Sequence, residues 1–181
     1  MSATYTIEEH NHRLAAWGAG SAASVRNVCT FRVQTGVEIL EASGFGPNLS
    51  EPDQLPAADE MDKAHQKWRK RVINEAAVHH KNFSHGQAAK LINSYLKVRF
   101  VCGGFHEHPK VQSLHPPIDR LLLDSLSKDD VGGFGKEWRA LRDRAWSKFT
   151  SEEYQKVIDL IRRTVQGRPL WVIEQYWQGH Q

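Results

Sequence analysis

Residues 84–97 read SHGQAAKLINSYLK, and the rest of the chain can be placed around them. Ser84 and Gln87 form a capping box, in which each side chain satisfies a free backbone N–H group at the start of a helix. Apolar residues then recur at intervals of three and four, which predicts a helix with one face in the core. They are Ala88, Leu91, Ile92, Tyr95 and Leu96.

The second face of this helix is polar. Lys90, Asn93, Ser94 and Lys97 are three, four and seven residues apart, so their side chains share one side of the helix. A stripe with two ammonium groups and two small polar groups could bind phosphates, or one of its lysines could act as a reactive amine. A pair of lysines that keeps a surface helix solvated is the structural alternative.

The neighbouring segments also favour helices. Residues 59–80 carry apolar residues at helical spacing, with lysines and arginines on a solvated face. The link at 81–86 is short, which predicts an antiparallel hairpin with the helix that follows. Residues 44–58 hold prolines and glycines and are expected to form a surface loop within the same domain.

Further helices are expected toward both ends of the chain. Thr6 with Glu9 begins one that ends or bends in the small residues 18–23, before an extended piece around 28–33. Pro116 and Pro117 start another. The remaining helices are expected at 35–42, 134–148, 151–165 and in a short segment from Leu170 to Trp177. The sequence therefore predicts an all-α, compact, single-domain helical bundle over residues 1–181.

Charge and cysteine content narrow the function classes. The chain has 24 Lys and Arg against 21 Asp and Glu, a basic balance that permits a nucleic-acid partner without establishing it. Cys29 and Cys102 give neither a disulfide framework nor an iron–sulfur spacing, as expected of a cytoplasmic protein. No apolar run approaches the roughly 20 residues of a membrane span, and no leader is visible, so neither export nor membrane insertion is expected.

A second polar feature lies at residues 114–120, which read LHPPIDR. Asp119 is expected in the first turn of the helix that follows the two prolines. There its carboxylate lies near free N–H groups and the positive end of the helix dipole. As a purely structural residue it would stabilise the helix by about 0.3–1 kcal/mol.

Two segments together resemble the helix-hairpin-helix DNA glycosylase superfamily: FSHGQAAK at 83–90 and HPPID at 115–119. A hairpin with a glycine, a helix with lysine on one face and a later Pro-x-Asp helix start follow the order of its archaeal 8-oxoguanine branch. The resemblance covers about residues 59–127. The chain is also similar in type to small bacterial glycosylases that act against phages with hydroxymethylated or glucosylated cytosine.

This resemblance implies a catalytic role for Asp119, which would stabilise an oxocarbenium-like sugar and orient water, with Lys90 assisting. The chain departs from the family in having one hairpin glycine, Gly86, where two are usual. It also has Ala88 where members with lyase activity often have lysine. The resemblance therefore implies a monofunctional enzyme that leaves an abasic site and needs no cofactor or metal.

The implied partner of this monomer is double-stranded DNA with a modified base flipped out of the stack. Backbone N–H groups at the start of the 84–97 helix could hold phosphates. The expected DNA contacts are Lys81, Ser84, His85, Gly86, Gln87, Asn93 and Lys97. The candidate base pocket comprises Trp17, Phe45 and Trp68, each of which could equally belong to the core.

Two other functions compete with the glycosylase. Arg99 and His106 fit the loose spacing of HEPN-type helical ribonucleases, although Gly103 and Gly104 would then have to lie within a helix. A non-catalytic helical DNA-binding module is the third reading. A thiolate with imidazoles is a zinc-compatible set, and Cys102, His106, His108 and His115 are expected in one glycine-rich loop. The Cys-x3-His-x-His spacing matches no zinc-binding pattern, so an exposed loop of histidines is expected. No glycine-rich phosphate loop, nucleophile elbow or dinucleotide fingerprint is present.

Overall fold

The computed structural model describes residues 4–24, 30–80 and 82–179. Within these ranges the chain is helical and contains no strand, which confirms the all-α prediction. The α-helices are α1 (Ile7–Ala23), α2 (Val33–Ala42), α3 (Met61–Ala76), α4 (His85–Leu96), α5 (Pro109–Gln112), α6 (Arg120–Lys128), α7 (Gly135–Arg144) and α8 (Ser151–Val165). No helix in the described ranges is long and apolar enough to cross a membrane.

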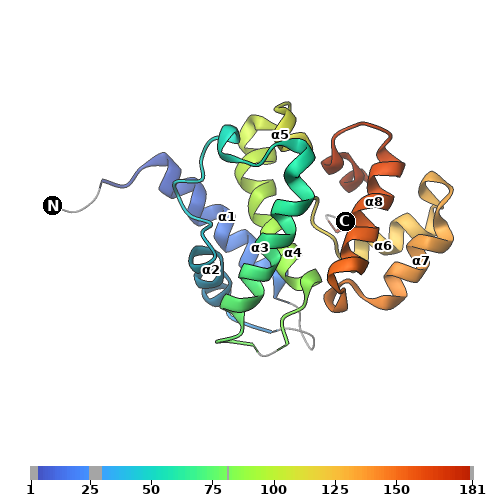
Figure 1. The fold of residues 1–181 in the computed structure, drawn as a ribbon, viewed down its shortest axis with the longest axis horizontal. Coiled ribbons are helices and arrows are strands. Elements are labelled where there is room, and N and C mark those ends of the chain that lie inside the picture. The colour runs from blue at the N-terminus through green and yellow to red at the C-terminus, as the bar shows by residue number, and fades with distance from the viewer. Residues whose placement is uncertain (1–3, 25–29, 81, 180–181) are drawn as a thin grey trace.

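The buried helix α4 lies near the middle of the fold (Figure 1) and contributes side chains to two hydrophobic clusters. Its residues Leu91, Ile92 and Tyr95 pack into a first cluster with α1, α2 and α3. Ala89, on another side of the helix, belongs to a second cluster built by α6, α7 and α8. Because both clusters share α4, the chain folds as one domain.

Helix α1 runs through its small residues and ends at Ala23, within the stretch 18–23 where an end or a bend is predicted. Ala19 and Gly20 are buried against the start of α2. A Cβ atom on Gly20 would lie 2.7 Å from the carbonyl oxygen of Val33. The small residues therefore serve close helix packing. Of the extended piece expected around 28–33, residues 28 and 29 lie outside the described ranges, residues 30–32 belong to no helix or strand, and Val33 is the first residue of α2.

The link between α3 and α4 is longer than predicted. Helix α3 ends at Ala76, not His80, and α4 begins at His85. Gly86 consequently lies in the first turn of α4. A Cβ atom there would lie 1.8 Å from the carbonyl oxygen of Trp146, so only glycine allows the Trp146–Lys148 3₁₀ turn to pack on this helix end.

Other predicted helices begin or end at different residues. The two prolines precede α6 and do not start it, because Asp119 is its N-cap and Arg120 its first residue. The expected 134–148 helix is split: α7 ends at Arg144, and the positive φ of Ala145, 67°, separates it from the 3₁₀ turn. Near the C-terminus, Leu170–Tyr176 forms a 3₁₀ helix.

Candidate active site

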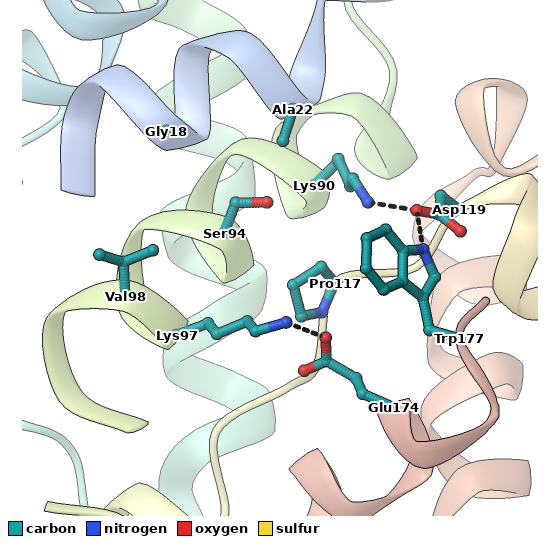
Figure 2. Close-up of a pocket in the computed structure, with 10 residues that line it drawn as sticks. All are labelled: Gly18, Ala22, Lys90, Ser94, Lys97, Val98, Pro117, Asp119, Glu174 and Trp177. Carbon is teal, nitrogen blue, oxygen red and sulfur yellow. Dashed lines mark hydrogen bonds and ion pairs between the residues drawn. The ribbon is translucent and has the colours of Figure 1, made fainter. Parts of the chain in front are cut away.

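The structure brings Lys90 and Asp119 together. The Nζ atom of Lys90, on α4, lies 2.9 Å from Oδ2 of Asp119, at the start of α6 (Figure 2). Their side chains are 8% and 19% exposed. An ion pair is thus held in a largely enclosed position between the two halves of the fold.

Both oxygens of Asp119 have donors. As N-cap of α6, Asp119 has an extended backbone, and its Oδ1 accepts a hydrogen bond of 2.9 Å from the N–H group of Leu122. Oδ2 accepts from Lys90 and, at 3.0 Å, from the indole N–H group of Trp177. A helix end, an ammonium group and an indole together fix the orientation of this carboxylate.

A cavity of about 200 Å³ opens beside the ion pair. It lies between α1, α4, the segment before α6 and the C-terminal residues (Figure 2). Its lining comprises Gly18, Ala22, Lys90, Ser94, Lys97, Val98, Pro117, Asp119, Glu174 and Trp177. The polar stripe predicted for α4 therefore faces this cavity, with the exception of Asn93.

A second ion pair closes another side of the cavity. Lys97, two turns after Lys90, binds the carboxylate of Glu174. The side chain of Glu174 is 16% exposed, and this burial raises its pKa although the ammonium group of Lys97 opposes the shift. The Nζ atom of Lys97 also lies 5.9 Å from the ring centre of Trp177. The cavity thus combines an aromatic face with charged groups of both signs.

Sequence reasoning missed Glu174 and Trp177. The sequence predicts only a short apolar helix at residues 170–177. In the structure this segment packs against α6, and this packing places Trp177 at Asp119. The one available signal was a charged residue and a tryptophan three positions apart in a mostly apolar segment.

The predicted phosphate site at the start of α4 is wrong in its main elements, because residues 146–149 cover this helix end. Gly86 donates its N–H group to the carbonyl oxygen of Phe149 at 3.3 Å. Ser84 and Gln87 satisfy each other in the capping box, and the Ser84 hydroxyl donates to the carbonyl oxygen of Ser147. These polar groups already make hydrogen bonds within the fold and are not available to bind phosphate.

The other predicted DNA contacts have separate positions. Asn93 is 1% exposed and makes hydrogen bonds only within the fold, so it is not a DNA contact. The Nδ1 atom of His85 lies 3.4 Å from Nε of Arg69, and Lys97 faces the cavity. Lys81 lies outside the described residues.

The structure does not bring the three predicted base-pocket aromatics to Asp119. Phe45 is 2% exposed and packs against Trp68 and Tyr95 in the first cluster. Trp17 is 59% exposed on α1 and borders a different hollow, between α1 and α2. Helical packing uses Phe45 and Trp68 as core, and Trp177 takes the aromatic position at the cavity.

The two residues of the ribonuclease hypothesis differ in burial. Arg99 is 5% exposed, and its guanidinium donates to the carbonyl oxygens of Glu8, Pro47 and Leu49. His106 and Cys102 are exposed, but Cys102 lies in the π-helix Lys97–Phe105 and not in the expected loop. Gly103 and Gly104 also fall within this helix, where Gly104 has a non-helical φ of 94°. The described part of the chain contains no cluster of three or more His, Cys, Asp or Glu residues that could hold a metal ion.

Comparisons of the chain with protein-family models, curated proteins and solved structures found no match.

Proposed function

We propose that this protein is a DNA glycosylase that hydrolyses the bond between a modified base and deoxyribose and leaves an abasic site. The observation that carries the proposal is the Lys90–Asp119 ion pair beside an open cavity of about 200 Å³. It supports the proposal because a fixed carboxylate next to a small, mostly apolar cavity with an aromatic side chain suits chemistry on an extruded base.

Asp119 is the catalytic residue in this proposal. When the glycosidic bond breaks, its electron pair leaves with the base and positive charge develops on the sugar. A carboxylate held in place by three donors can stabilise that charge without reorganising. Water then adds to C1′, giving it a hydroxyl group, and the second proton of the water accompanies the departing base.

Lys90 is assigned a supporting role. Its ammonium group donates a hydrogen bond to Asp119, and an ammonium group so engaged has no lone pair with which to attack the sugar. This arrangement favours hydrolysis by a monofunctional enzyme. Trapping with borohydride is therefore expected to give no covalent complex, and a complex lost in Lys90→Met would instead assign lyase activity.

The cavity is smaller than the roughly 300 Å³ at which pockets for drug-sized ligands begin, and this favours a base over a complete nucleotide. Trp177 offers a stacking surface, and Lys97 with Glu174 offers hydrogen-bonding groups. Damaged bases and cytosines modified with hydroxymethyl or glucosyl groups are the proposed substrates, the last with the sugar projecting from the cavity mouth.

The test uses duplex DNA with a panel of damaged bases, together with phage DNA that carries hydroxymethylated or glucosylated cytosine. After incubation, alkali converts abasic sites into strand breaks. Wild-type protein should produce breaks, and Asp119→Asn should produce none while still binding DNA. Asparagine is a good N-cap, so this substitution removes the charge and preserves the helix start. Asp124→Asn, on the exposed side of α6, is the matched control.

Intact DNA with every substrate would contradict the proposal. RNA cleavage that is lost in His106→Ala and retained in Asp119→Asn would replace it with the ribonuclease. Salt-sensitive binding without product from either nucleic acid would leave a non-catalytic module.

A further inference from the structure

A continuous chain of buried hydrogen bonds crosses the interface between the two halves of the fold. Arg69 Nη1 lies 2.9 Å from His65 Nδ1, and His65 Nε2 lies 2.7 Å from Asn93 Oδ1. The Asn93 amide nitrogen lies 2.9 Å from the Tyr154 hydroxyl oxygen. That hydroxyl lies 3.1 Å from His115 Nδ1, and His115 Nε2 lies 2.8 Å from Asp62 Oδ1.

The chemistry of these groups fixes the direction of every bond. The Asn93 carbonyl oxygen can only accept, so His65 donates from Nε2 and accepts at Nδ1 from Arg69. The carboxylate of Asp62 likewise requires His115 to donate from Nε2, and a neutral His115, the form favoured because burial lowers its pKa, accepts the Tyr154 O–H at Nδ1. All donors therefore point from a guanidinium toward a carboxylate.

Both histidines must be neutral for this chain to exist. Burial lowers the pKa of His65, with further lowering by the charges of His115 and Arg69. Burial also lowers the pKa of His115, against the opposing effect of Asp62. A neutral imidazole has one N–H group, and the hydrogen-bond directions given above require one N–H group on each histidine.

This series of hydrogen bonds is connected to the segment that carries Asp119. His115 is a member of both, and the second N–H group of Asn93 donates to the carbonyl oxygen of Pro116 at 2.8 Å. Asn93 and Lys90 are neighbours on α4, one turn apart. Helix α4 thus holds the segment at Pro116 through Asn93 and at Asp119 through Lys90.

We infer that Asn93 and His115 are positioning residues, which set the distance between Asp119 and Lys90 by fixing the Pro116 backbone against α4. The inference rests on the proposed function for its catalytic meaning. Its alternative is that these residues only satisfy one another in the core.

The decisive variant is Asn93→Asp, which keeps the size of the side chain and its acceptor for His65 but removes both N–H donors. We expect the single-turnover rate of base release to fall about 10- to 100-fold, with the Kd for DNA unchanged. The amide hydrogen of Leu122, which Asp119 caps, should exchange at least about tenfold faster in the same variant.

Tyr95→Phe is the matched control, because Tyr95 is also on α4 and its buried hydroxyl bonds with His12 and Gly46, away from Asp119. It should leave the rate and the Leu122 exchange unchanged at the same temperature. If Asn93→Asp does not fold, His115→Gln serves instead, since glutamine can still donate to Asp62 while the contact with Tyr154 is lost. We expect the same two changes in it, each smaller.

The possible results separate the inference from the proposed function. If Asn93→Asp behaves like Tyr95→Phe in both measurements, the positioning role is wrong. If the wild-type protein releases no base from any DNA but Leu122 exchange still responds to Asn93→Asp alone, the positioning stands and the glycosylase proposal fails.

Discussion

The two ion pairs of the cavity use the same helix and the same residue types, yet they are built differently. Lys90 pairs with Asp119, whose carboxylate also caps α6 and accepts the Trp177 indole N–H group. Lys97 pairs with Glu174, a longer side chain from a 3₁₀ helix. Burial raises the pKa of Glu174, so its negative charge is less well stabilised than that of an ordinary surface carboxyl group.

This difference indicates how the work is divided within the cavity. A short side chain anchored at a helix N-terminus has little freedom to move, which suits a group that must meet a developing charge. A longer side chain with a raised pKa can exchange its lysine partner for a ligand. We therefore propose that Asp119 acts in the reaction and that Glu174 with Lys97 acts in ligand binding.

Neutralising each carboxylate in turn gives the largest expected contrast. Asp119→Asn should lower the single-turnover rate of base release at least about 100-fold, the loss typical of one electrostatic group at a reaction centre. Glu174→Gln should act mainly on substrate binding, raising KM about tenfold with a smaller change in kcat. Equal losses of kcat in the two variants would remove the distinction between the pairs.

Removing each lysine should affect stability unequally. Lys90→Met leaves a largely buried carboxylate without its cation and should lower the free energy of unfolding by about 2–3 kcal/mol. Lys97 is 35% exposed, so solvent screens its pair, and Lys97→Met should cost about 1 kcal/mol. Urea unfolding at neutral pH measures both, and the reverse order would contradict this account of their burial.

Asp62 provides the opposite case to Glu174. Partial burial raises its pKa, but hydrogen bonds from His115 and Arg162 outweigh this, so the pKa is lowered overall. A lowered folded-state pKa stabilises the protein above the unfolded-state value and loses that effect as the pH falls. Asp62→Asn should therefore be about 1 kcal/mol less stable at pH 7, a modest figure because the side chain is 35% exposed.

The check on Asp62 is a series of urea unfolding curves between neutral pH and about pH 3, below the ordinary value for Asp of about 3.9. The difference between wild type and Asp62→Asn should shrink as the pH falls. A difference that stays constant over this range would show that the carboxylate charge contributes nothing.

The sequence was informative where local rules dominate. The capping box at Ser84 and Gln87 and the apolar spacing after it predicted α4, and the resemblance paired Lys90 with Asp119 before the structure brought them together. The sequence did not predict the contacts between segments that are far apart along the chain. Trp146 covers the glycine that was expected to face phosphates, and the C-terminal segment brings Trp177 to Asp119. No periodicity encodes either contact.

The proposed stabilisation of a cation-like sugar by Asp119 can be measured without knowing the target base. The measurement is the Kd for duplex DNA in which one deoxyribose is replaced by a protonated pyrrolidine, compared with the neutral tetrahydrofuran analogue. The wild-type protein should bind the cationic duplex about 100-fold more tightly, and Asp119→Asn should lose at least about tenfold of this preference. Equal affinity of the wild-type protein for the two duplexes, or a preference that survives Asp119→Asn, would contradict the claim.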